Sequence, residues 1–197
     1  RNAINTGKVP DLSRVVASPR EGIAYAYQSL SEILQGEANE SYLLLYAQAA
    51  RFIAPNDADA QIATARLFNA LGQHDAAAQT FAQVTTDDPA FHSAEIGRAE
   101  SLRLAGQFEK AIEVLSQLTR SHPDLPTPHA SLGDICRQLG QLVDARQSYD
   151  AALSAYPEDA SLRWWLLYSR GITNERLDEW DAAELDFRAA LAFNPGN

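Results

Sequence analysis

Four histidines are the side chains of this sequence that first suggest metal or acid–base chemistry. They are His74, His92, His122 and His129, and they share no spacing typical of metal ligands and have no cysteine partners. His122 and His129 lie on either side of a proline-rich connection, so we expect them in a solvated loop and at a helix start. The histidines therefore predict no metal site.

An acidic stretch and a single cysteine are the other chemical candidates. Residues 56–59 read Asn-Asp-Ala-Asp, but they lack the glycine and the later bidentate glutamate of a calcium loop, and helix capping explains them. Cys136 falls on an apolar stripe without a basic neighbour, which predicts an inert core thiol. No glycine-rich phosphate loop or GxSxG elbow is present. We therefore expect no enzymatic activity and no cofactor.

The bulk composition limits the classes of partner. The 197 residues carry 26 acidic and 16 basic side chains, a net charge of −10 that would repel a phosphate backbone, so we expect no nucleic-acid partner. A hydrophobic content of 46% is typical of a soluble globular protein. No apolar run approaches the roughly 20 residues that cross a bilayer. The chain begins at Arg1 and contains no methionine, so we expect a fragment of a longer protein.

Three kinds of residue recur with one common period, which points to the elements that organise the chain. The interval is 34 residues in each of three sets: Pro55, Pro89, Pro123 and Pro157; Gly72, Gly106 and Gly140; Ala77, Ala111 and Ala145. A glycine can end a first helix in a left-handed conformation, and the alanine lets a second helix pack closely against it. The proline then ends that second helix, because it lacks an N–H and clashes with the preceding turn.

Large side chains keep the same interval inside the second helices. Phe81, Leu115 and Tyr149 recur at equivalent places, where we expect them to fill the space between stacked helices. The period and its residue types resemble the tetratricopeptide repeat (TPR), with small first-helix residues at Ala65, Ala99 and Gly133. The strict match covers residues 58–157.

The resemblance implies an all-α protein: a right-handed α-α superhelix of about ten helices in five helix-turn-helix repeats. We expect an irregular arm or linker over residues 1–19, followed by a degenerate helix pair at 20–57. Repeats are expected at 58–91, 92–125, 126–159 and 160–197, the last with a four-residue insertion, because Pro195 lies 38 residues after Pro157.

The wording of four segments narrows the resemblance. Residues 36–39, 88–92, 120–126 and 170–176 are similar to long multi-repeat TPR proteins of alphaproteobacteria. That likeness implies an exported bacterial protein, periplasmic or envelope-associated rather than cytoplasmic, with a role in envelope assembly or maintenance.

The resemblance also implies a concave groove lined by the first helix of each repeat, where a protein or peptide partner would bind. Its groove positions map onto Asp59, Ile62, Arg66, Asn69, Ser93, Ile96, Glu100, Arg103, Thr127, Ala130, Asp134, Arg137, Trp165, Tyr168, Ile172 and Glu175, with Tyr25, Gln28 and Glu32 in the first helix pair. Aliphatic residues at Ile62, Ile96 and Ala130 do not fit the two-carboxylate clamp of chaperone-binding TPRs.

Several of these residues have a second interpretation. Glu100 with Arg103, and Asp134 with Arg137, are three residues apart on one helix and can neutralise each other as ion pairs. Trp164 and Trp165 lie about 100° apart on a helix, so Trp165 belongs either to the core or to the groove.

Two functions remain open at this point. A binding module would hold an extended or helical peptide in the groove. A structural module would instead self-associate through its end helices, where Leu185, Leu191 and Phe193 lie on the last one, giving a homo-oligomer.

Overall fold

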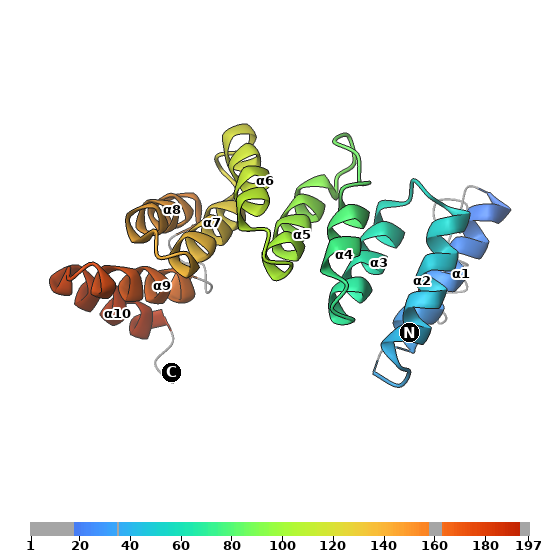
Figure 1. Cartoon of the computed structure of the whole chain (residues 1–197), viewed down its shortest axis with the longest axis horizontal. Coiled ribbons are helices and arrows are strands. Elements are labelled where there is room, and N and C mark those ends of the chain that lie inside the picture. Colours follow the sequence, from blue (N-terminus) through green and yellow to red (C-terminus); the bar gives the residue numbers. More distant parts are fainter. Residues whose placement is uncertain (1–17, 35, 158–162, 194–197) are drawn as a thin grey trace, which may run out of the picture. The chain divides into compact units, whose positions relative to one another are not determined.

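Ten α-helices make up almost all of the described chain in a computed structural model (Figure 1). The structure describes residues 18–34, 36–157 and 163–193, and no strand occurs within these ranges. The helices are α1 (Pro19–Ile33), α2 (Glu40–Ile53), α3 (Ala58–Ala70), α4 (His74–Phe81), α5 (Phe91–Leu104), α6 (Phe108–Ser121), α7 (Pro126–Gln138), α8 (Leu142–Ala155), α9 (Arg163–Arg176) and α10 (Trp180–Phe193). The predicted all-α fold with about ten helices is confirmed.

Each odd-numbered helix packs against the even-numbered helix that follows it. The chain divides into two compact units, residues 1–90 with α1 to α4 and residues 91–197 with α5 to α10. None of the described helices is both long and apolar enough to span a bilayer. The expected arm over residues 1–19 lies outside the described residues up to position 17; α1 begins at Pro19, capped by the Ser18 side chain.

The turn inside each of the last four helix pairs has a residue in the left-handed region. Gly140 has φ 75°, and the N–H of the next residue, Gln141, donates to the carbonyl of Cys136 at 2.9 Å. This pattern closes a helix C-terminus by satisfying carbonyls that lack partners within the helix. Asp178 takes the glycine's place between α9 and α10 with φ 61°, and Glu179 donates to Asn174 at 2.9 Å. The turn geometry thus continues where the glycine does not.

Helix α4 departs from the expectation that each second helix runs to its proline. It ends at Phe81, well before Pro89, whereas α6 continues to Ser121 at the equivalent place. The following residues include Val84 and Thr85, which are β-branched and less favourable in helices. Successive turns replace the helix there: Val84 N–H donates to Phe81, and Asp88 N–H donates to Thr85.

The four extra residues of the last repeat fall between two helices. Helices α9 and α10 follow α7 and α8 with an offset of 38 residues at the second helix, where Trp180 corresponds to Leu142. The insertion therefore lies between Ala155 and Arg163, a connection that includes the undescribed residues 158–162. Neither helix of the last pair is longer for it, so the face that α9 presents can be kept.

Small residues set how closely the two helices of a pair approach. Ala77, Ala111 and Ala145 are fully buried, as are Leu115 and Tyr149, which confirms their expected core positions. A Cβ added at Gly133 of α7 would lie 2.6 Å from the Tyr149 ring of α8. Gly171 of α9 stands in the same relation to Phe187 of α10, at 2.7 Å. The rings thus occupy space that any larger residue would need.

We expect Gly133→Ala to lower the free energy of unfolding by about 1–2 kcal/mol. Overpacking a core costs typically 1–3 kcal/mol, and the better helix propensity of alanine offsets about 1 kcal/mol. Urea unfolding followed by circular dichroism measures the difference. The double variant Gly133→Ala/Tyr149→Leu copies the Ala99 and Leu115 of an earlier repeat and should recover part of the loss. A single variant as stable as the parent would contradict the steric argument.

Candidate functional site

Three first helices of the second unit, α5, α7 and α9, line a pocket of about 670 Å³ dominated by polar side chains. We call it the charged pocket; its lining is Glu100, Arg103, Leu115, Ser131, Asp134, Ile135, Arg137, Gln138, Trp165 and Arg176. Predicted groove residues from three separate repeats therefore meet in one depression.

Ion pairs within single helices occupy much of the charged pocket. The Arg103 guanidinium lies 2.6 Å from the Glu100 carboxylate, and that hydrogen bond raises the pKa of Arg103. Arg137 and Asp134 are 3.5 Å apart, so both of the predicted intrahelical pairs form. Arg103 also donates to Gln138 Oε1 at 3.2 Å, which links α5 to α7. The pocket wall is therefore pre-arranged and largely neutral.

Tyr149 connects the charged pocket to the core beneath it. Its ring is fully buried, while its hydroxyl donates to Asp134 at 2.7 Å and accepts from Arg137 Nε at 3.2 Å. Burial, reinforced by the bond to Asp134, raises the pKa of the Tyr149 hydroxyl well above its usual value. The hydroxyl therefore stays protonated and fixes the Asp134 carboxylate as an acceptor.

A second pocket, of about 600 Å³, opens beside the first and is mostly apolar. We call it the aromatic pocket; its lining is Arg137, Trp164, Trp165, Tyr168, Ser169, Ile172, Phe187, Ala190 and Leu191. Trp165 is 36% exposed and Tyr168 49% exposed, whereas Trp164 is partly buried against the core. The two tryptophans thus divide the roles that the sequence left open, with Trp165 at the pocket surface.

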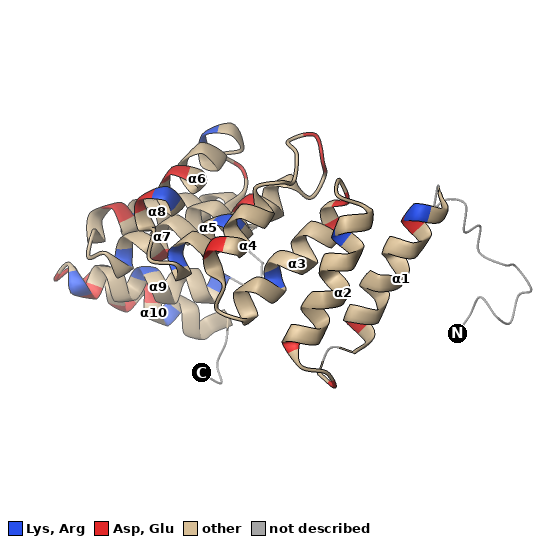
Figure 2. Cartoon of the chain, turned by 45° about the vertical axis from the view of Figure 1, so that its right-hand side comes forward, with Lys and Arg blue, Asp and Glu red and all other residues tan. Residues whose placement is uncertain are grey.

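Arg137 and Trp165 line both pockets, so the apolar and the charged surfaces are continuous. The arrangement can accept an apolar side chain of a ligand in the aromatic pocket while polar groups of the same ligand reach the charged pocket. Charged side chains are also more frequent along α5 to α10 than along α1 to α4 (Figure 2).

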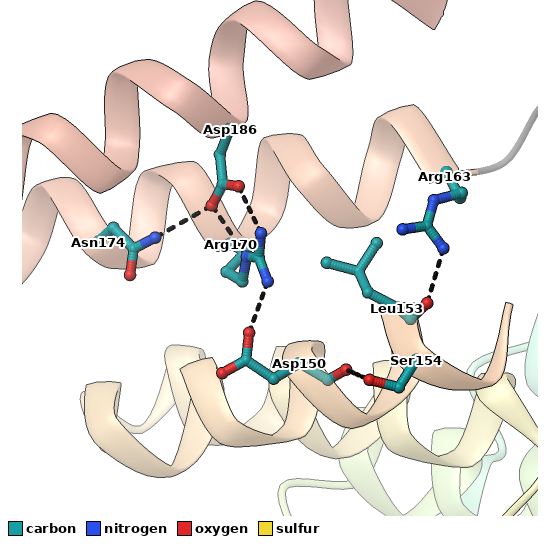
Figure 3. A network of polar contacts seen from close by, with 7 residues as sticks. All are labelled: Asp150, Leu153, Ser154, Arg163, Arg170, Asn174 and Asp186. Atoms are coloured by element: carbon teal, nitrogen blue, oxygen red, sulfur yellow. Dashed lines mark hydrogen bonds and ion pairs between the residues drawn. The ribbon is translucent and has the colours of Figure 1, made fainter. Parts of the chain in front are cut away.

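A buried polar network holds α9 in place between its neighbours (Figure 3). Arg170 of α9 donates to both carboxylate oxygens of Asp186 on α10, at 2.9 and 2.6 Å, and to Asp150 of α8 at 2.6 Å. Asn174 also donates to Asp186 at 3.0 Å. Asp186 is only 2% exposed, and its bonds raise the pKa of Arg170. The network lies on the side of α9 that carries no pocket residue and stabilises the helix that does.

The other predicted groove residues lie elsewhere. On α3, Ile62 is 8% exposed and packs into the core, so the expectation that it presents a binding surface is wrong; Ala130 of α7 is likewise buried. Asp59 is exposed, and Asn69 approaches His74 at 3.1 Å. Arg66 lines a separate pocket of the first unit, together with Glu32.

In the second unit, Ser93 and Thr127 are exposed, Ile96 is half-buried and Glu175 is exposed, and none of them lines the two pockets. Tyr25 of α1 is also exposed, and Gln28 of the same helix donates to Glu32 at 3.3 Å.

Sequence reasoning missed Arg176, Phe187 and Leu191 as pocket residues. Arg176 lies one helical turn after Ile172, so the 3.6-residue period could have favoured it over Glu175. Phe187 and Leu191 belong to a second helix, and its surface was not considered as groove.

The side chains with possible chemistry show one departure from expectation. Cys136 is buried, and burial raises the pKa of its thiol, in agreement with an inert core cysteine. Asp57 caps α3 by accepting from Ala60 N–H at 3.0 Å, as helix capping predicted. His92 and His122, however, come within 2.9 Å of each other although they were expected to be independent. Within the described ranges, no three His, Cys, Asp or Glu side chains gather as a metal cluster.

Comparisons with known proteins agree on one kind of repeat. Family models described as tetratricopeptide repeat match residues 59–90 and 96–160. No curated protein matches the sequence.

Similar solved structures include "MamA 41-end from Desulfovibrio magneticus RS-1", at 18% identity and a TM-score of 0.72, covering 92% of this chain and 99% of that one. "Crystal structure of YrrB: a TPR protein with an unusual peptide-binding site" matches at 14% identity and a TM-score of 0.63, covering 95% and 94%. A structure titled for Pseudomonas aeruginosa pilF matches at 16% identity and a TM-score of 0.71, covering 91% and 80%. At these identities the likeness is one of fold.

We expect Asp186→Ala to lower the free energy of unfolding by about 2–4 kcal/mol, because it leaves a partly buried guanidinium and the Asn174 amide without their acceptor. The matched control is Glu184→Ala, which breaks the exposed pair with Arg188 on the same helix and should cost less than about 1 kcal/mol. Urea unfolding of both variants measures the contrast. Equal losses would show that the Arg170 network does not hold α9.

Proposed function

Because the chain is a tetratricopeptide repeat protein, we propose that it is a protein-interaction scaffold whose binding site is the surface formed by α5, α7 and α9. The ligand is a polypeptide segment that places an apolar side chain in the aromatic pocket and polar groups in the charged pocket. The observation that carries this proposal is the joining of the two pockets by Arg137 and Trp165.

The aromatic pocket has the character of a binding hot spot. Trp165 and Tyr168 are large side chains with substantial exposed surface, and the Tyr168 ring lies 5.8 Å from that of Phe187. Tryptophan and tyrosine are enriched among residues that dominate interface energies. Their rings are already ordered by packing on α10, so binding would cost little side-chain entropy.

The charged pocket supplies orientation. Glu100, Arg103, Asp134 and Arg137 hold both signs of charge, and Arg176 adds a guanidinium that donates to the Arg137 carbonyl at 3.3 Å. Mixed charges at the edge of an apolar site select a direction and register of the ligand more than they add affinity. The peptide-binding site named for YrrB supports peptide as the ligand class here.

Self-association is the second candidate, and a different surface favours it. Trp180 and Leu185 on α10 are 61% and 69% exposed, as unusual for large apolar side chains as Phe52 on α2 at 85%. Such surfaces on helices of a repeat array favour stacking on another copy. Under this alternative the apolar side chains outside the aromatic pocket would be buried in an oligomer.

The binding test uses peptides selected from a displayed random library on the untagged chain. For a selected peptide, Trp165→Ala and Arg176→Glu should each weaken binding, the first by about 10- to 100-fold, as expected for loss of a hot spot. Calorimetry or fluorescence anisotropy with labelled peptide measures the change.

The chain provides matched controls. Trp180→Ala removes an exposed tryptophan outside both pockets, and Arg188→Glu reverses an arginine on α10; both should bind as the parent does. If the control variants lose as much affinity as the pocket variants, or if no peptide is enriched, the proposed site is wrong. Light scattering over a range of concentrations separates the alternative, since a mass that rises with concentration and falls on Leu185→Glu would favour self-association.

We further propose that the scaffold acts in envelope assembly or maintenance, as the family resemblance of its sequence implies. Fractionation of the source cell with an antibody against this chain should place the signal in the periplasmic or envelope fraction. Protease added to spheroplasts should then remove it. A signal found only in the cytoplasmic fraction and protected from protease would overturn this part of the proposal and leave the peptide site untouched.

A further inference from the structure

Two histidines from different helices meet at one end of the α5–α6 pair. His92 is in the first turn of α5, and His122 follows the last residue of α6, thirty positions later. Their Nε2 atoms are 2.9 Å apart, and their ring planes meet at 62°. The helix hairpin thus places two imidazole nitrogens at a separation that needs an explanation.

Ser121 determines which nitrogen of His122 carries a proton. The Ser121 hydroxyl donates toward the carbonyls of Gln117 and Leu118, at 3.1 and 3.2 Å. Its oxygen therefore accepts from His122 Nδ1, 2.8 Å away, which must be the protonated nitrogen of the neutral ring. The Nε2 atom of His122 is left with a free lone pair directed toward His92.

A simple hydrogen bond between the rings accounts poorly for this contact. In a linear N–H···N bond the ring centres are farther apart than the nitrogens by about two ring radii. The centres of His92 and His122 are only 4.0 Å apart, which leaves room for about one radius beyond the 2.9 Å between the nitrogens. At least one nitrogen is therefore strongly off the line, where a hydrogen bond is weak.

The same geometry suits two ligands of one metal ion. Nitrogens 2.9 Å apart can both lie at the usual metal–imidazole distance of about 2.0–2.1 Å, with an angle of about 90° at the ion. That angle fits the square or tetragonal coordination of Cu²⁺ and Ni²⁺ better than the tetrahedral coordination of Zn²⁺. We propose that His92 and His122 form a two-histidine chelate for a divalent transition-metal ion of tetragonal preference, Cu²⁺ or Ni²⁺.

The remaining coordination positions of such an ion stay open to water or to an outside ligand, since the described residues add no third His, Cys or carboxylate to the pair. The net charge of −10 raises the local concentration of cations. Ser121 acts as a positioning residue, because its hydrogen bond to Nδ1 fixes the ring and its tautomer, the role that outer partners of ligating histidines usually have.

The test titrates the untagged chain with CuCl2, NiCl2 and ZnCl2 by calorimetry, with the electron paramagnetic resonance of Cu²⁺ as a second readout. We expect one ion per chain, bound in the order Cu²⁺, Ni²⁺, Zn²⁺, and nitrogen hyperfine structure from the bound Cu²⁺. His92→Ala and His122→Ala should each weaken binding at least tenfold and reduce the nitrogen hyperfine structure.

Three controls keep the result interpretable. His129→Ala removes a nearby histidine whose Nε2 contacts the Pro123 carbonyl, and it should bind metal as the parent does. Ser121→Ala should weaken binding about tenfold while both ligands remain. Circular dichroism shows that each variant is folded. Equal metal binding by the parent, His92→Ala and His122→Ala, or no Cu²⁺ or Ni²⁺ site in the parent, would overturn the proposal.

Discussion

The spacing of α7 and α8 depends on the contact between Gly133 and the ring of Tyr149. The ring fills the volume in which any side chain at position 133 would start, and the same relation joins Gly171 to Phe187. This contact also places the Tyr149 hydroxyl, which emerges at the charged pocket and donates to Asp134. A packing constraint inside the helix pair therefore sets the position of a carboxylate on the surface that we propose for binding. Changes in the core and changes at the site are not independent here.

The aromatic pocket arises from a difference between two equivalent positions. Tyr149 is fully buried, but Phe187, at the same place in the next helix pair, is only half-buried and faces Tyr168. Apolar surface that is core in one repeat is thus exposed in another. On α9 the network of Arg170 faces α8 and α10, so polar contacts secure the helix while Trp165 and Tyr168 remain at the surface. Repeats that share one backbone pattern can in this way differ in what they bind.

Much of the fold could be predicted from the sequence, because the 34-residue period reports directly on local structure. The glycines and alanines occupy turns and close contacts, and Asp178 keeps the turn without a glycine. The early end of α4 could not be read from the period, because it depends on the local residues after Phe81. The repeat boundaries and the arm before α1 stay predictions.

The candidate site was predicted less well, for a physical reason. Groove positions follow from helix geometry alone, whereas exposure depends on which neighbours cover a residue; Ile62 and Ala130 are at groove positions and are buried. Arg176 replaces Glu175 because a helix has 3.6 residues per turn and the mapped positions are whole numbers. The His92–His122 contact joins residues thirty positions apart, and no spacing rule for metal ligands covers a pair brought together by a helix hairpin.

The two pockets contribute to binding in different ways. Arg103 and Arg137 already have carboxylate partners within their own helices, so a charged ligand must replace contacts rather than add them. Exchange of one partly exposed ion pair for another yields little, since such pairs stabilise by about 0–1 kcal/mol. Apolar surface in the aromatic pocket has no such competitor except water, and its burial contributes about 25 cal/mol per Å². Affinity should therefore come from the side chain that enters between Trp165 and Tyr168, and the ion pairs should decide which neighbouring residues of the ligand are tolerated. A binding surface built in this way discriminates by the cost of mismatched charge more than by the gain from matched charge.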